Sequence, residues 1–155
     1  MSTGGSERKL LVNNSWGPTH YLKSKVYDVP EGLFYTREHE WARIQESSVV
    51  IGITDYAAKT LNDVVYVSLP KLGERLKQFV SFGSIESIKA VSELYSPCSG
   101  IINKLNAELN THPELTNQSP YGDGWLLELK AENIELERMN LLSPTKYSNY
   151  LDSMK

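Results

Sequence analysis

Short segments in which apolar and polar residues alternate fill most of the chain from residue 33 onward, with turn-forming residues between them. Alternation at every second position is typical of strands that bury one face. Many short strands with frequent turns favour a mainly β, antiparallel sandwich. Residues 71–76 are expected as a turn. The segments expected as strands are residues 33–35, 41–45, 49–53, 64–69, 79–95 (as a hairpin), 99–106 and 125–130.

Helix signals are confined to short segments between and after these strands. Thr54 can cap a helix over residues 55–61 by accepting a hydrogen bond from an early backbone N–H. Residues 106–115 also favour helix. Ser143 and the proline that follows it predict the start of a C-terminal helix, because proline suits the first helical turn. Three side chains would share one face of that helix: Tyr147, Tyr150 and Leu151.

The N-terminal part of the chain lacks this strand pattern. Residues 1–9 combine Ser, Gly and charged residues without periodicity, which predicts a mobile end. Residues 10–30 contain enough apolar side chains to pack on a folded body, but Asn, Gly and Pro break them into irregular pieces. We therefore expect a partly flexible extension over residues 1–30 and one folded domain over residues 31–155.

One lysine stands at the centre of the expected hairpin. Residues 79–95 alternate on both sides of Lys89, and no Asn-Gly or Asp-Gly marks the turn. The bend therefore falls near Ser87 and Ile88, which leaves Lys89 at the tip. Many lysines on exposed strands are surface charges that oppose aggregation. A lysine on a rigid, exposed tip is also suited to carry a flexible prosthetic group.

Four sequence blocks favour the second interpretation. Residues 86–90 (ESIKA) resemble the lipoylation site of the glycine cleavage system H protein family. Residues 35–41 (YTREHEW), 52–57 (GITDYA) and 120–126 (PYGDGWL) resemble that family's other signature segments, in the same order. The resemblance implies a lipoyl/biotinyl fold of the hammerhead type: a flattened antiparallel β-sandwich with short helices, a C-terminal helix and the lysine hairpin at one end. Residues 31–155 would be this lipoyl-carrier domain.

The resemblance also implies a function. Lys89 would carry lipoate in amide linkage, and the dithiolane of this cofactor would perform the chemistry. The chain would be a non-catalytic carrier of glycine catabolism. Its swinging arm would take an aminomethyl group from glycine decarboxylase (P protein) to aminomethyltransferase (T protein). Dihydrolipoamide dehydrogenase (L protein) would reoxidise the arm, and a lipoate ligase or lipoyltransferase would attach the cofactor.

Residues beside the lysine are candidates for recognition by the modifying enzyme. Glu86 is the nearest charged residue and would be its recognition point, although an ordinary solvated carboxylate is the simpler interpretation. The small side chains of Ser87 and Ala90 would leave room for that enzyme to hold the extended strand.

Further candidates come from the cationic amine that the loaded arm would carry, because carboxylates in a cleft would hold it. The family resemblance assigns this role to Glu40 and Glu93. Many family members have Asp at the position of Glu93. Glu38 would add a third carboxylate or face solvent. Exposed ion pairs contribute about 0–1 kcal/mol, so useful protection of the amine requires partial burial.

Three alternatives remain open at this point. An H-protein-like carrier could serve another lipoate-dependent pathway, such as sulfur oxidation, or act in lipoyl relay. A biotin carrier is disfavoured, because biotin sites generally have methionine on both sides of the lysine, whereas Lys89 lies between Ile88 and Ala90. A structural or interaction domain that has lost its arm would leave Lys89 unmodified.

Composition argues against several other classes. The formal net charge is −3 and no basic cluster alternates with aromatic residues, so nucleic acid is not an expected partner. Cys98 is the only cysteine, which precludes an intramolecular disulfide and predicts a small buried hydrophobe. The histidines His20, His39 and His112 lack the spacing of metal ligands.

The sequence also bears on location. No apolar segment is long enough to span a bilayer, so no membrane partner is expected. The N-terminus has the features of neither a secretory signal nor an organellar transit peptide. We expect a cytoplasmic monomer, because a carrier must present its tip freely.

Overall fold

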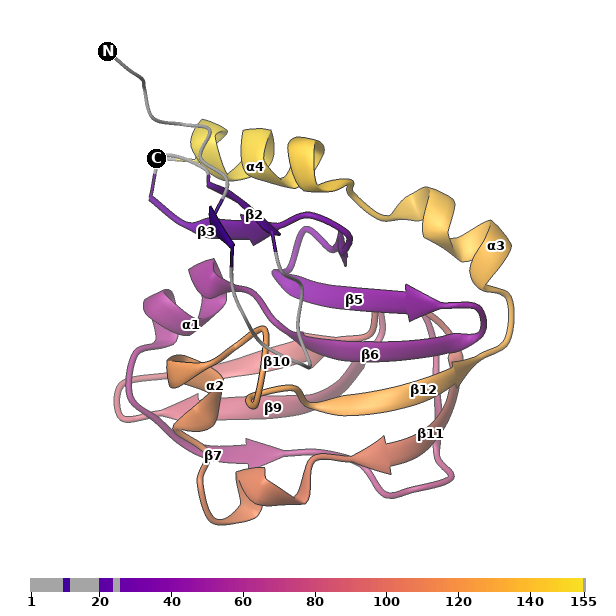
Figure 1. Ribbon diagram of the computed structural model, residues 1–155. Helices are drawn as coiled ribbons and strands as arrows, with labels where there is room; N and C mark the ends of the chain where they lie inside the picture. Colours follow the sequence, from indigo (N-terminus) through magenta and orange to yellow (C-terminus); the bar gives the residue numbers. More distant parts are fainter. Residues whose placement is uncertain (1–9, 12–19, 24–25, 155) are drawn as a thin grey trace.

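The computed structural model describes residues 10–11, 20–23 and 26–154, and the strands within them form three antiparallel sheets (Figure 1). The largest sheet contains, in spatial order, β4 (Phe34–Tyr35), β5 (Glu40–Gln45), β6 (Ser48–Ile53), β12 (Leu127–Ala131), β11 (Gly100–Leu105) and β8 (Arg75–Leu76). The second sheet contains β10 (Val91–Tyr95), β9 (Ser81–Ser87) and β7 (Val64–Ser68). The third contains β1 (Leu10–Leu11), β2 (His20–Lys23) and β3 (Asp28–Pro30).

Short helices connect and cover these sheets. Helix α1 (Asp55–Leu61) begins after Thr54, whose hydroxyl accepts a hydrogen bond from the Ala57 N–H at 3.3 Å. Helix α4 (Pro144–Ser153) begins after Ser143, whose hydroxyl accepts from the Lys146 N–H at 3.2 Å. The predicted cap at Thr54 and the predicted start of the C-terminal helix at Ser143 and Pro144 are therefore confirmed. The remaining helices are α2 (Leu115–Gln118), α3 (Ile134–Glu137) and the 3₁₀ helices η1 (Ala107–Asn110) and η2 (Arg138–Asn140).

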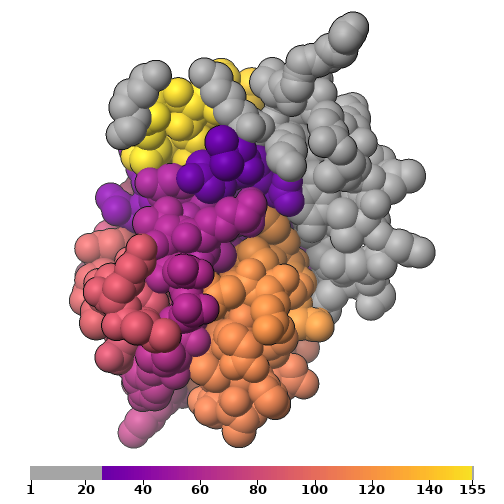
Figure 2. Space-filling model, turned by 90° about the vertical axis from the view of Figure 1, so that its left-hand side faces the viewer, coloured from indigo at the N-terminus to yellow at the C-terminus, as the bar shows by residue number. Residues whose placement is uncertain are grey.

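Strands β9 and β10 form the predicted hairpin around Lys89. They pair antiparallel from Glu86 and Val91 at the tip to Ser81 and Tyr95 at the base. Figure 1 places the tip at one end of the molecule, next to the segment between α1 and β7. Figure 2 faces this end, and the salmon-coloured atoms of the hairpin stand at the surface beside the magenta atoms of that segment.

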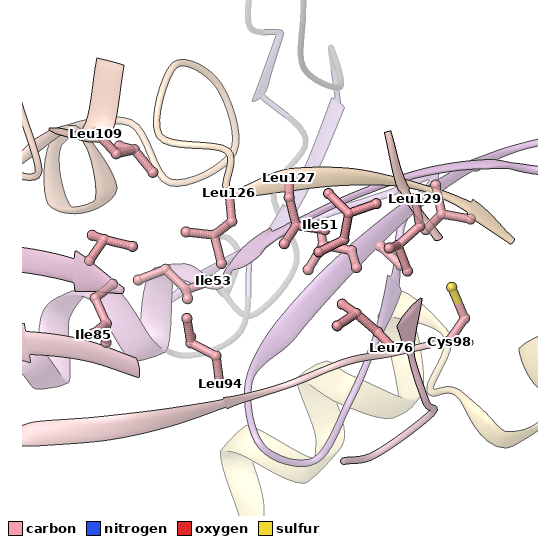
Figure 3. Packing of buried hydrophobic residues seen from close by; sticks show 14 of the residues in the cluster. Ile51, Ile53, Leu76, Ile85, Leu94, Cys98, Leu109, Leu126, Leu127 and Leu129 are labelled. Atoms are coloured by element: carbon pink, nitrogen blue, oxygen red, sulfur yellow. The ribbon is translucent and has the colours of Figure 1, made fainter. Parts of the chain in front are cut away.

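The base of the hairpin rests on the larger of two hydrophobic cores, between the largest and the second sheet. Ile85 and Leu94 are 1% and 2% exposed. Figure 3 shows Leu94 pointing toward Ile53 of β6, with Ile85 and Leu126 nearby. Burying an aliphatic side chain of this size contributes about 1.5–3 kcal/mol, so the hairpin has a rigid base. Cys98 is fully buried in the same core, as predicted.

Strand β6 separates this core from a smaller one. Its odd-numbered residues face the larger core, whereas Val50 and the neighbouring Trp41 belong to the smaller core with residues of β3 and α4. Gly52 provides the space for Trp41, because a Cβ there would lie 2.5 Å from the indole ring. The mainly β fold with a C-terminal helix is thus confirmed. No helix in the described part of the chain is long and apolar enough to cross a membrane.

Three regions differ from the sequence-based expectation. Residues 106–115 were expected as helix, but they contain only the 3₁₀ helix η1, and α2 begins at Leu115. Residues 71–76 were expected as a turn, but Arg75–Leu76 forms a short strand that pairs with β11. Residues 10–30 were expected to be irregular, but they contain β1, β2 and β3. Tertiary contacts explain β3: Val29 is fully buried, and the Asp28 N–H donates to the Asp55 carboxylate at 3.0 Å. The expected mobile end at residues 1–9 lies outside the described residues.

Candidate functional site

Lys89 lies at the exposed apex of the β9–β10 hairpin. Ile88, Lys89 and Ala90 connect the two strands and are all exposed, with Ile88 at 75%. Glu86, the residue expected to contact a modifying enzyme, is also exposed. The predicted tip is therefore confirmed, and its lysine is accessible to a large partner.

Ser87 closes the turn from the inside. Its backbone N–H donates to the Ala90 carbonyl at 2.8 Å, and its hydroxyl accepts from the N–H groups of Ala90 at 3.1 Å and Lys89 at 3.3 Å. Ser87 is only 5% exposed. The Ser87 side chain thus supports the backbone of the turn. The sequence had suggested only that its small size leaves room for a modifying enzyme.

The segment before β7 holds the tip from the side. The Ile88 N–H donates to the Asp63 carbonyl at 3.1 Å, and Val64 pairs with Ser87. Asn117 of α2 fixes this segment with three hydrogen bonds. Its amide donates to the carbonyls of Ala58 at 3.1 Å and Asn62 at 2.9 Å, and its carbonyl accepts from the Val64 N–H at 2.8 Å.

A pocket of about 380 Å³ lies at the other end of β10. Its walls come from the segment around β4, the residue Phe79 before β9, the end of β10 and the segment between η2 and α4. We call it the corner pocket. Its lining residues are Tyr35, Thr36, Arg37, Glu38, Phe79, Tyr95, Asn140 and Leu142.

Glu40 lies directly behind this pocket and is 1% exposed. The turn that places it depends on His39, which has φ +79° and donates its N–H to the Thr36 carbonyl at 3.2 Å. The Thr36 hydroxyl donates to one carboxylate oxygen of Glu40. The Tyr95 N–H donates to the other at 2.9 Å, which joins β5 to β10. Two lining residues of the corner pocket thus hold the buried carboxylate.

The environment of Glu40 favours its neutral form. Burial raises the pKa of Glu40 from 4.5 to about 7, although the hydrogen bonds from Thr36 and Tyr95 oppose this change. The charge of Glu38 raises the pKa further. A carboxyl group that exchanges its proton near neutral pH can respond to a cation in the adjoining pocket.

The other two predicted carboxylates differ in their position relative to this pocket, because Glu93 is not among its lining residues. Glu38 is exposed and lines it directly. Glu93 is exposed and accepts a hydrogen bond from the Ser81 hydroxyl. Because strand residues alternate, Val91, Glu93 and Tyr95 share the face of β10 opposite the buried Leu94. This face leads from the lysine tip to the corner pocket over about 14 Å, at about 3.4 Å per residue.

His39 contributes to the packing of this corner rather than to a metal site. Its Nδ1 lies 2.8 Å from the Tyr147 hydroxyl, and its ring lies 4.3 Å from that of Tyr56. Burial lowers the pKa of His39 to about 4, so the ring is neutral at physiological pH. Among the described residues, no three His, Cys, Asp or Glu side chains gather closely enough to bind a metal ion.

A second pocket, of about 530 Å³, lies between β7, β11 and η1. Its lining contains Lys104 and no carboxylate. It therefore lacks the groups that would hold a cationic amine.

The sequence did not predict a role for four residues of the site: Thr36, Phe79, Tyr95 and Asn117. Their roles depend on contacts between distant segments. Tyr95, for example, meets Glu40 across 55 positions of sequence. Only Thr36 carried a local signal, since a hydroxyl four residues before a buried carboxylate can reach it within one turn.

The family comparison agrees with the site geometry. A protein-family model described as "Glycine cleavage H-protein" matches residues 33–154, most of the chain.

This chain belongs to the glycine cleavage H-protein family.

Curated relatives and a solved structure give the same result. The chain is 46% identical over 125 residues to the glycine cleavage system H protein of Rubrobacter xylanophilus, covering 81% of this chain and 96% of that protein. It is 45% identical over 129 residues to the probable glycine cleavage system H protein of Pyrococcus abyssi, covering 83% and 96%. The crystal structure of the Mycobacterium marinum H protein superposes with a TM-score of 0.72 at 33% identity, covering 80% of this chain and 99% of that chain.

Membership settles the class of protein. H proteins are non-catalytic carriers and hold lipoate covalently on a lysine. The chain is therefore the lipoyl carrier of a glycine cleavage system, and the resemblance seen in the sequence is confirmed.

Proposed function

We propose that Lys89 bears the lipoyl group. The single observation that carries this proposal is the position of Lys89 at an exposed apex whose backbone is fixed by Ser87 and by the Asp63 carbonyl. The apex suits an amide-linked arm, because the anchor is held while the amine remains accessible. Glu86 and Ala90 flank it on the exposed surface, where a lipoate ligase or lipoyltransferase would bind.

The far end of the arm would rest near the corner pocket. When bound, lipoate supplies a dithiolane that opens to carry the aminomethyl group. The outward face of β10 provides a path from Lys89 past Glu93 to the pocket. Glu38 and Glu93 would attract the amine, and Glu40 would give up its proton when the cation arrives, because a nearby positive charge lowers the pKa of a carboxyl group.

The proposed cycle uses the glycine cleavage components as partners. Glycine decarboxylase would load the arm, aminomethyltransferase would unload it, and dihydrolipoamide dehydrogenase would reoxidise it. The relatives are glycine cleavage proteins, which favours this pathway over sulfur oxidation or lipoyl relay.

We propose a monomer that works in the cytoplasm. We also propose residues 31–155 as the carrier domain, a boundary that the family match over residues 33–154 supports.

Intact mass and peptide mapping test the central claim. Protein from its native cells, or produced with a lipoate ligase and lipoate, is expected to show one lipoyl adduct, located on Lys89. Lys89→Arg should abolish the adduct and leave thermal unfolding unchanged, since the side chain is exposed. Lys104 is another exposed lysine, so Lys104→Arg is the matched control, and this variant should carry the adduct on Lys89 as the parent protein does. An unmodified Lys89 under these conditions would overturn the proposal.

A further inference from the structure

Phe79 has a backbone conformation that is unfavourable for its side chain. Its φ is +64°, in the left-handed region that bulky residues rarely adopt. It occupies the third position of a four-residue turn in which the Val80 N–H donates to the Lys77 carbonyl at 3.1 Å. Glycine is the usual residue where such a turn requires positive φ. The ring is 47% exposed, so burial in the core does not explain its presence.

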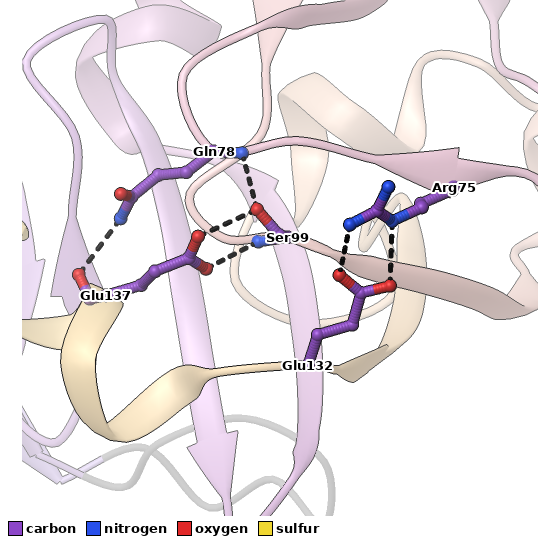
Figure 4. A network of polar contacts seen from close by, with 5 residues as sticks. All are labelled: Arg75, Gln78, Ser99, Glu132 and Glu137. Carbon is purple, nitrogen blue, oxygen red and sulfur yellow. Dashed lines mark hydrogen bonds and ion pairs between the residues drawn. The ribbon is translucent and has the colours of Figure 1, made fainter.

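Hydrogen bonds on both sides keep this turn in place, and Figure 4 shows those that Gln78 makes with Ser99 and Glu137. The Phe79 N–H donates to the Ser96 carbonyl at 2.7 Å. The Gln78 N–H donates to the Ser99 hydroxyl at 3.0 Å, and the Gln78 amide donates to the Glu137 carbonyl at 2.9 Å. Strained conformations persist where the surroundings fix them in this way, and they concentrate at functional sites.

The ring of Phe79 has a defined place in the corner pocket. It lines the pocket together with Tyr95 and Glu38. Asn140, on the same wall, donates its amide to the Gln78 side chain at 3.0 Å, so the wall and the turn form one hydrogen-bonded unit. Ser81, two residues after Phe79, donates to Glu93. The aromatic ring therefore lines the same pocket as Glu38, and Glu93 lies on β10 two residues before the lining residue Tyr95.

We propose that Phe79 is the aromatic wall that covers the loaded end of the lipoyl arm, an inference that rests on the proposed function. An aromatic face attracts a cation through its quadrupole, and the ring also limits access of water to the amine. Glu38 and Glu93 supply the opposite charge. The unfavourable turn at Phe79 is then retained because it directs an aromatic ring toward the arm, where glycine would leave the pocket open.

Phe79→Gly separates this role from a structural one, because the two effects have opposite signs. Glycine relieves the backbone conformation, so the apparent melting temperature of the unlipoylated protein should rise by about 2–4 °C. The half-life of the loaded holoprotein, measured without the T protein, should fall about two- to fivefold. Phe79→Leu should shorten the half-life similarly without raising the melting temperature. Val80→Ala changes an exposed neighbour that does not line the pocket and should alter neither.

A spectroscopic measurement provides a second readout. With ¹³C-labelled glycine as donor, the methylene resonance of the loaded arm should show an aromatic ring-current shift that Phe79→Gly removes and Val80→Ala retains. An unchanged resonance and half-life in Phe79→Gly would overturn the inference while leaving the carrier function intact. Failure of the proposed function is distinguished beforehand, because the intact mass would then show no lipoyl adduct on Lys89.

Discussion

The hairpin tip and the corner pocket lie at opposite ends of β10 and are built in opposite ways. The tip places an exposed lysine on a turn held by neutral hydrogen bonds, chiefly from Ser87. The corner pocket has a buried carboxylate behind it, that of Glu40, whose pKa burial raises to about 7. The tip is accessible and contains no buried charged group. The pocket end contains a buried carboxylate, whose charged form burial disfavours.

The difference follows from what each end must do. If Lys89 bears the lipoyl group, as proposed, enzymes have to reach it, so the tip cannot gain its order from burial and depends on local backbone contacts instead. The proposed amine has to be withdrawn from water, so the pocket needs a carboxylate in a place where the charged form is disfavoured. Substitutions at the pocket should therefore change the pH dependence of stability. Substitutions at the tip should change modification of Lys89 more than stability.

Glu40→Gln should give the largest effect. The pKa of Glu40 in the folded protein is raised from 4.5 to about 7, so the native state holds this proton more tightly than the unfolded chain. The resulting stability is fully present below about pH 4.5 and is lost as the pH rises through about 7. A change of this size corresponds to about 3 kcal/mol. Glutamine keeps an acceptor for the Tyr95 N–H and does not titrate.

Chemical denaturation between about pH 4.5 and about pH 8 measures this effect. The free energy of unfolding of Glu40→Gln, relative to the parent protein, should increase by about 3 kcal/mol across that range. Glu108→Gln alters an exposed glutamate far from the pocket and should give a curve parallel to that of the parent. If the Glu40→Gln curve is parallel as well, burial does not perturb Glu40 and the contrast between the two regions is lost.

Asn117→Asp tests how the tip is held and should cost about 1–2 kcal/mol, because the carbonyls of Ala58 and Asn62 lose their donor. The segment before β7 should loosen. Amide hydrogen exchange at Ile88, which donates to the Asp63 carbonyl, should then accelerate, and lipoylation of Lys89 should slow.

Asn106→Asp is the matched control for this variant. Asn106 also donates twice through its side-chain amide, to the carbonyls of Asp123 and Trp125, and accepts once from the Glu108 N–H. It is buried, so its replacement should destabilise the protein at least as much as Asn117→Asp. Exchange at Ile88 should nevertheless remain unchanged. Equal acceleration in both variants would show that the tip responds only to global stability.

These regions also differ in how far the sequence could predict them. Alternation of apolar residues locates the hairpin and places Lys89 at its tip, because tip and strands are local features. The caps at Thr54 and Ser143 follow from local chemistry in the same way. Family resemblance alone assigns Glu40 and Glu93 to the arm, and it leaves open whether Glu38 is a third carboxylate or faces solvent.

What the sequence could not supply depends on contacts between distant segments. The burial of Glu40 follows from the meeting of β5 with β10. The positive φ of Phe79 contradicts the ordinary preference of its side chain and is fixed by Ser96 and Ser99. The strand β3 forms because Asp55 and its neighbours hold the chain there. No periodicity in the local sequence carries this information.

Ser87→Ala should have the smallest effect, and it decides between two roles for this residue. The hydroxyl accepts from the N–H groups of Lys89 and Ala90, and its loss should cost about 0.5–1.5 kcal/mol. If the side chain of residue 87 matters only because it is small, Lys89 of the Ser87→Ala variant should be lipoylated as fast as Lys89 of the parent protein. If it closes the turn, lipoylation should slow although alanine is smaller. Ser92→Ala, on the adjoining strand, should leave the rate of lipoylation unchanged, so a slower rate confined to Ser87→Ala would establish that the order of the tip comes from its own hydrogen bonds.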